Sequence, residues 1–65
     1  MKNDSLPVRT VVILKHDYYF REYVITSDDG EEYTLCRYAG KPITNMSRKV
    51  RKTAIGAVCS LGQKE

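Results

Sequence analysis

The sequence predicts an α+β fold, in which a three-stranded antiparallel β-sheet is covered on one face by a C-terminal α-helix. Two segments within residues 8–26 are dense in β-branched and aromatic side chains, which favour strands. An Asp-Gly pair at residues 29–30 is typical of a tight hairpin. Further along the chain, apolar residues recur near helical spacing from Val50 to Leu61.

The three strands are expected at residues 8–15, 18–26 and 31–38. Pro7 favours an extended backbone before the first strand, and His16-Asp17 is expected to form the turn or bulge after it. Asp29-Gly30 supplies the positive φ values that a type I′ hairpin turn requires. Gly40 and Pro42 are expected to end the third strand, because both residues interrupt a β-ladder.

The helix is expected at about residues 47–61, with Ser47 as its N-cap and Gly62 as the residue that closes it. Gly56 argues against this helix, because a glycine inside a helix destabilises it by about 1 kcal/mol relative to alanine. A shorter helix, or a turn followed by a strand at residues 57–61, is the alternative. The apolar stripe of the helix would consist of Val50, Ala54, Ile55, Ala57, Val58 and Leu61.

The position of the hairpin loop decides which side chains share a face of the sheet. With Asp29-Gly30 as the loop, Val24 lies opposite Leu35. A one-residue slip, with Asp28-Asp29 as the loop, would exchange the two faces. The core face, covered by the helix, would carry Phe20, Val24, Tyr33 and Leu35. The open face would carry Tyr19, Arg21, Tyr23, Ile25, Thr34, Cys36 and Tyr38.

The length of 65 residues corresponds to one domain, expected at residues 8–62 between flexible tails at 1–7 and 63–65. A chain this short buries only about 60% of the surface it exposes when unfolded, so folding needs most of its apolar residues. The longest apolar run, residues 11–14, is far shorter than the roughly 18 residues that span a bilayer. With no visible signal peptide either, the expected location is the cytoplasm.

Charge is unevenly distributed along the chain, whose net charge is +3. Residues 1–36 carry four basic and seven acidic side chains, whereas residues 37–65 carry seven basic side chains and one acidic one. The sharpest cluster is the basic segment at residues 47–52. This asymmetry favours a polyanionic partner. The alternative is a solvated face whose positive field is partly neutralised by the acidic hairpin tip.

No group of residues predicts catalysis, a metal site or a cofactor. His16, Cys36 and Cys59 are the candidate soft ligands, and they are not at ligand spacing. The two cysteines are expected to be reduced, although a single disulfide is possible. The carboxylates of residues 28–32 are expected to be exposed, either as solubilising charge or as an acidic spot for a basic partner. The chain is therefore not expected to be an enzyme.

The residues of the hairpin and of the basic region also resemble a known family. The run from Asp28 to Arg37, then Gly40-Lys41 and Arg48-Lys49, is similar to the β2–β3 turn and Gly-Lys…Arg-Lys region of translation initiation factor 1 type domains. Those domains are OB-fold RNA-binding barrels, so the resemblance implies a small OB-like or SH3-like β-barrel as the alternative fold. The chain departs from the pattern at residues 42–47, and too little chain follows Leu61 for a fifth barrel strand.

The function predicted from these observations is a small, basic, regulatory domain that binds DNA or RNA. The alternative is a non-catalytic modulator of a larger protein complex, since tyrosine and arginine are enriched at binding hot spots. Neither a membrane partner nor a cofactor is expected, and a homodimer is possible. The residues expected to contact phosphates are Arg21, Lys41, Arg48, Lys49, Arg51 and Lys52. The residues expected to stack on bases or meet a partner are Tyr19, Tyr23 and Tyr38.

Overall fold

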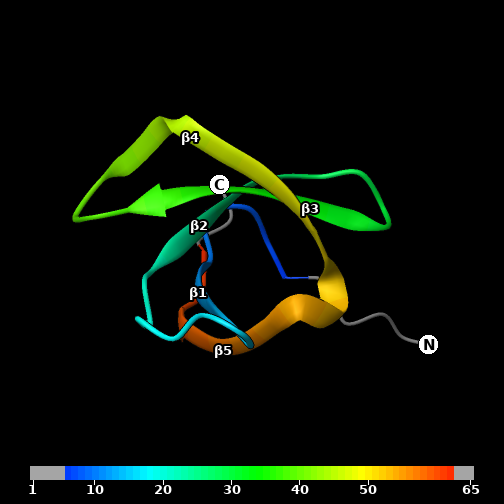
Figure 1. Ribbon diagram of the computed structural model, residues 1–65. Helices are drawn as coiled ribbons and strands as arrows, with labels where there is room; N and C mark the ends of the chain where they lie inside the picture. Colours follow the sequence, from blue (N-terminus) through cyan, green and yellow to red (C-terminus); the bar gives the residue numbers. More distant parts are fainter. Residues whose placement is uncertain (1–5, 63–65) are drawn as a thin grey trace.

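The computed structural model describes residues 6–62, which form a single antiparallel β-sheet and contain no α-helix. Its strands are connected in the order β4-β3-β2-β1-β5. The sheet curls, so that β3 and β4 cross the top of Figure 1 and β1 and β5 lie below them. The elements are β1 (Val11–Leu14), β2 (Tyr23–Asp28), β3 (Glu32–Tyr38), β4 (Pro42–Arg51), a 3-10 turn η1 (Lys52–Ala54) and β5 (Ile55–Ser60).

The predicted α+β fold with a helix at residues 47–61 is wrong. Most of the basic segment belongs to β4, where Val50 lies opposite Tyr33 and its side chain enters the core. The third strand needs a partner for its free edge, and this long-range pairing outweighs a helical pattern already weakened by a central glycine. Ser47 does not cap a helix, because its hydroxyl donates a hydrogen bond to the Thr44 carbonyl within β4. The alternative of a turn followed by a strand is nearer to the observed η1 and β5.

Glycines in the last segment allow the backbone to pass close to other parts of the chain, and they belong to no helix. A Cβ atom on Gly56 would lie 3.0 Å from the Lys15 Cα, at the end of the pairing of β5 with β1. A side chain on Gly62 would collide with the backbone of residues 8–10. The Gly62 N–H donates to the hydroxyl of the fully buried Thr10 at 2.9 Å, which ties the end of the described chain to its beginning.

The predicted register of the β2–β3 hairpin is wrong, because the loop is displaced by one residue and the pairing at the tip by two. Asp28 pairs with Tyr33, and the Asp29 N–H donates to the Glu32 carbonyl, so the loop is Gly30-Glu31 and not Asp29-Gly30. A bulge near Thr26 then moves the pairing back by one residue, so that Ile25 faces Leu35 and the net offset from the predicted pairing is one residue. This odd offset, which the bulge produces, turns β2 over relative to the prediction, whereas β3 keeps its predicted faces.

The core therefore contains the β2 residues that were expected on the open face. Tyr23 and Ile25 are buried, while Val24 belongs to a second, smaller cluster on the other face of the sheet. Burial of each large aliphatic side chain contributes about 1.5–3 kcal/mol. The main cluster consists of Val12, Tyr23, Ile25, Tyr33, Leu35 and Val50, with Leu6, Leu14, Ala54 and Ile55 packed against it. The second cluster consists of Val11, Val24 and Cys36, with Tyr38 beside it.

Tyr33 connects the beginning of the described chain to the core. Its side chain is 1% exposed, and its hydroxyl accepts a 2.7 Å hydrogen bond from the Leu6 N–H. Leu6, which was expected to belong to a flexible tail, is thus fixed to the sheet. Residues 1–5 and 63–65 of the expected tails lie outside the described residues.

The strand order tests the OB-fold alternative. From β1 to β4 the order in the sheet follows the sequence, but β5 lies beside β1, at the edge opposite to β4. An OB-fold follows a Greek-key order instead. The order here, with a 3-10 turn before a last strand that pairs with β1, does not support the OB-fold implied by the resemblance. A fifth strand forms before Leu61, contrary to the expectation of too little chain. No helix within residues 6–62 is long and apolar enough to cross a membrane.

Candidate functional site

The loop between β1 and β2, residues 15–22, presents three consecutive aromatic side chains to solvent. Tyr18, Tyr19 and Phe20 are 91%, 74% and 72% exposed. The sequence predicted a strand from residue 18, with Phe20 in the core, and the structure corrects both expectations because β2 begins only at Tyr23. In a chain with so small a core, three large aromatic side chains left in solvent indicate a binding surface.

Hydrogen bonds to Asp17 give this aromatic loop a defined shape. One carboxylate oxygen of Asp17 accepts from the Tyr19 N–H and the other from the Arg21 N–H, both at 3.0 Å. The Asp17 carbonyl accepts from the Phe20 N–H at 3.2 Å. Phe20 has a φ of +53°, in the left-handed region that costs a residue with a side chain about 1–2 kcal/mol. Strain of this kind persists where surrounding contacts enforce it, and it is concentrated at functional sites.

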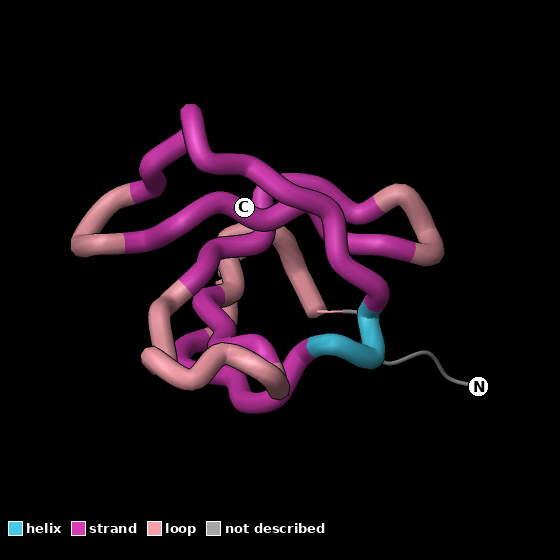
Figure 2. The backbone as a smooth tube through the Cα atoms, viewed as in Figure 1, coloured by secondary structure: helices cyan, strands magenta, loops and turns pink. Residues whose placement is uncertain are grey.

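A groove of about 360 Å³ lies between the aromatic loop, β4 and η1. Figure 2 shows the loop in pink and the 3-10 turn in cyan. Tyr18 and Tyr19 contribute aromatic surface to it, and Arg21 and Arg48 contribute positive charge. The Arg21 guanidinium lies 4.7 Å from the centre of the Tyr19 ring, a cation–π contact that orients both side chains. The groove is lined by Leu14, His16, Asp17, Tyr18, Tyr19, Arg21, Tyr23, Arg48, Val50 and Ala54.

A second concavity, of about 280 Å³, adjoins the groove and shares three residues with it. Tyr18 borders both hollows, while Phe20 and Lys15 line the second one alone. The aromatic loop therefore offers ring surfaces to two neighbouring spaces, each with a basic side chain. The shared residues are His16, Asp17 and Tyr18.

A further arginine lies on the sheet beside the groove. Arg37 is the partner of the groove residue Tyr23 in the pairing of β2 with β3, so the two side chains lie on the same face of the sheet. The Nε atom of Arg37 is buried and has no hydrogen-bond partner in the described part of the protein. Positive charge therefore extends from the aromatic loop onto the sheet.

The structure brings together only some of the residues that the sequence nominated. Arg21, Arg48 and Tyr19 meet at the groove, and Tyr23 lines it although the residue is only 5% exposed. Tyr38 packs beside the second cluster on the other face of the sheet, which excludes it from this site. Lys41 lies in the β3–β4 turn and does not line the groove.

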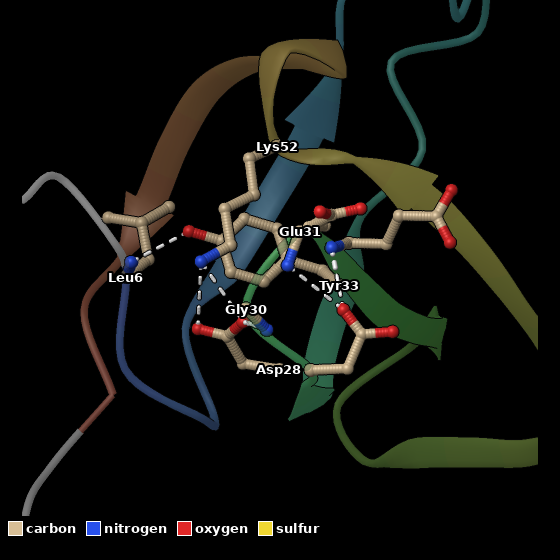
Figure 3. Close-up of polar contacts among 8 residues, drawn as sticks. Leu6, Asp28, Gly30, Glu31, Tyr33 and Lys52 are labelled. Carbon is tan, nitrogen blue, oxygen red and sulfur yellow. Dashed lines mark hydrogen bonds and ion pairs between the residues drawn. The ribbon is translucent and has the colours of Figure 1, made fainter.

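The remaining basic residues of the segment lie near the acidic β2–β3 tip. Lys52 forms a 3.0 Å ion pair with Asp28, and its ammonium lies 5.1 Å from the centre of the Tyr33 ring (Figure 3). Lys49 pairs with Asp29 at 3.7 Å. Arg51 lines an open hollow together with Glu31, Glu32, Lys52 and Thr53. The acidic tip thus neutralises part of the segment, as the alternative interpretation of the sequence expected.

Backbone hydrogen bonds at the tip favour the ionised carboxylates. The Gly30 N–H and then the Lys52 ammonium hold the pKa of Asp28 below its ordinary value of 3.8. The N–H groups of Glu32 and Glu31 and then Lys49 lower the pKa of Asp29 in the same way. Both aspartates are therefore charged at neutral pH and remain so in mild acid.

Sequence reasoning missed Tyr18 and Phe20, two of the three exposed rings. Aromatic residues favour strands, so a run of them was assigned to a strand. The available signal for a loop was Asp17, directly before the aromatic run that ends at Arg21. An aspartate often organises a loop by accepting hydrogen bonds from the backbone N–H groups that follow it.

Neither a metal centre nor a disulfide occurs within residues 6–62. No three His, Cys, Asp or Glu side chains gather there in a way that could hold a metal ion. Cys36 and Cys59 are both free; Cys36 is buried and Cys59 is exposed.

Comparisons with protein-family models, with curated proteins and with solved structures found no match to this chain. The groove and the side chains around it are therefore the basis for a functional proposal.

Proposed function

We propose that this chain is a non-catalytic domain that binds single-stranded nucleic acid, with its bases on the aromatic loop and its phosphates on the adjoining arginines. The observation that carries the proposal is the juxtaposition of two exposed rings, those of Tyr18 and Tyr19, with Arg21 and Arg48 around one groove, next to a hollow lined by the third ring. Stacking on an aromatic side chain contributes about 1–3 kcal/mol per base and tolerates any base. Arginine binds phosphate through paired hydrogen bonds.

The exposed rings favour a single strand over a duplex. The bases of a duplex are stacked on each other and can offer their faces to a protein only after unstacking. Tyr18 borders two neighbouring hollows, so one base on each side of its ring would suit the surface. The carboxylate of Asp17, the acidic residue in the groove, already accepts hydrogen bonds from two backbone N–H groups.

The test is fluorescence anisotropy of a labelled oligodeoxythymidine and of the matching RNA at low salt, compared with a duplex of equal length. Wild type is expected to prefer the single strands. Tyr18→Ala/Phe20→Ala should weaken binding by about tenfold or more for each ring removed, since 1.4 kcal/mol corresponds to a factor of ten. Arg48→Ala should also weaken binding and make the salt dependence shallower, because fewer phosphates are neutralised.

Two variants outside the groove serve as matched controls. Lys41→Ala removes a cation, and Met46→Ala removes an exposed apolar side chain of β4. Neither should change affinity as much as its counterpart in the groove. Equal affinity for duplex and single strand, or unchanged binding by the double alanine variant, would contradict the proposal. Binding of a protein or proline-rich peptide without any binding of oligonucleotides would instead support a protein-binding modulator.

A further inference from the structure

Two carboxylates of the β2–β3 tip form ion pairs with two lysines, one in β4 and one in η1. Lys52 Nζ lies 3.0 Å from one oxygen of Asp28 and 3.2 Å from the other. Asp29 lies 3.7 Å from Lys49 Nζ. The Asp28–Lys52 side chains are only 23% and 25% exposed, whereas those of Asp29–Lys49 are 50% and 62% exposed. Water therefore screens the second pair more strongly than the first.

We infer that Lys49 and Lys52 form a second phosphate-binding element. In the free protein these lysines pair with the Asp28 and Asp29 carboxylates, and in the complex the phosphates of the nucleic acid replace those carboxylates. This inference rests on the proposed function. A carboxylate that bridges to a lysine marks a position where an anionic oxygen is stabilised, and a phosphate oxygen offers the same charge to the same ammonium. The acidic tip thus acts as an internal competitor for the ligand.

The second element adjoins the groove across the edge of β4. Arg48, Val50 and Ala54 line the groove, and Lys52 begins η1, the turn that contains Ala54. Successive side chains of a strand point to opposite faces, so Lys49 lies on the face of β4 opposite to Arg48. Because β4 is an edge strand, a single strand that leaves the groove past η1 would meet Lys52 and could reach Lys49 across this edge.

The tip contains a second acidic pair that does not take part in this competition. Glu31 and Glu32 adjoin Asp29, but within residues 6–62 neither forms an ion pair. Substituting these two glutamates therefore shows the effect of net charge on affinity, apart from the effect of the specific contacts with Lys49 and Lys52.

Asparagine at positions 28 and 29 removes the competing charge and preserves the turn. Gly30 donates to Asp28 Oδ1, and Glu31 and Glu32 both donate to Asp29 Oδ1. An asparagine Oδ1 accepts the same bonds. Asp28→Asn/Asp29→Asn is expected to bind oligodeoxythymidine about tenfold more tightly than wild type. Its slope of log affinity against log salt should steepen by up to about 1.4, from two further cations at about 0.7 each.

Glu31→Gln/Glu32→Gln changes the net charge by the same amount and is the control. It should raise affinity by no more than about twofold to threefold, through long-range attraction alone. Adding Lys49→Gln/Lys52→Gln to the asparagine variant should abolish its gain, while the same lysine changes in wild type should lower affinity by no more than about twofold to threefold, through the loss of long-range attraction alone. Thermal unfolding of each variant checks that it is folded.

The outcomes separate this inference from the proposed function. If neither wild type nor the asparagine variant binds single strands, the proposed function is wrong. If wild type binds through the groove but the asparagine and glutamine variants gain equally, or neither gains, the second element does not exist. A gain confined to the asparagine variant and reversed by the lysine changes supports the inference.

Discussion

The β1–β2 loop and the β2–β3 tip are built by the same device and used in opposite ways. In each, an aspartate side chain accepts hydrogen bonds from backbone N–H groups a few residues further on: Asp17 in the aromatic loop, and Asp28 and Asp29 at the tip. The loop then presents unpaired rings to solvent, whereas the tip turns its charges onto lysines of the same molecule. The difference lies in whether the presented side chains already have a partner.

The two regions also differ in how their aspartates use their oxygens. Asp17 accepts one backbone bond on each oxygen. Asp28 and Asp29 accept their backbone bonds on Oδ1 alone. Lys52 contacts both oxygens of Asp28, and Lys49 pairs with Oδ2 of Asp29. Asparagine therefore keeps every backbone bond at the tip and loses one in the loop. The same substitution should be conformationally neutral in one region and disruptive in the other.

Among the substitutions that test this comparison, Asp17→Ala is expected to have the largest effect on binding affinity. Without its acceptors the aromatic loop loses its fixed shape, and ordering it again on binding should cost about tenfold in affinity for oligodeoxythymidine. Asp17→Asn removes the same charge but keeps one acceptor, so its affinity should lie between alanine variant and wild type. Fluorescence anisotropy measures both. Wild-type affinity in the alanine variant would show that the shape of the loop is irrelevant.

The sequence was sufficient for the tip and for β3, where local chemistry decides the structure. Asp-Gly placed the turn to within one residue, and Tyr33 and Leu35 face the core as predicted. The exact register was beyond local reasoning. It depends on side-chain hydrogen bonds of Asp29 that move the loop by one residue, and on a bulge near Thr26. One residue of slip is enough to turn over a whole strand.

The sequence was insufficient where a distant partner decides the structure. Residues 42–51 become a strand because β3 offers an edge and the core offers a place for Val50, and no periodicity within that segment shows either fact. The candidate site was half predicted for the same reason. Arg21, Arg48 and Tyr19 were nominated by residue type, but the groove exists only because β4 lies beside the aromatic loop.

A smaller effect should come from one left-handed position in each of the two regions, Phe20 in the loop and Gly30 at the tip. Phe20→Gly relieves about 1–2 kcal/mol of backbone strain and adds about 0.5–1 kcal/mol of unfolded-state entropy. The net gain of about 1 kcal/mol or less should raise the melting temperature by up to about 8 °C, while binding weakens. Gly30→Ala is the matched opposite, because φ is +101° and no atom obstructs the new methyl group. It should destabilise by about 1 kcal/mol. A loss of stability in Phe20→Gly would show that the loop is not strained.

The smallest effect expected is the acid sensitivity of the tip. Because the folded-state pKa values of Asp28 and Asp29 lie below the ordinary value of 3.8, these groups stabilise the fold at higher pH. That contribution is complete above about pH 3.8 and is lost as the pH falls through the lower folded-state pKa values. Melting temperatures measured by circular dichroism between about pH 7 and pH 2 should therefore decline at the acid end. In Asp28→Asn/Asp29→Asn the decline should be shallower and should start from a slightly lower value, since the ion pairs with the lysines are gone. Glu31→Gln/Glu32→Gln should retain the wild-type decline. An equal flattening in both variants would mean that the acidic tip acts through its net charge, and that its contacts with Lys49 and Lys52 have no separate effect on stability.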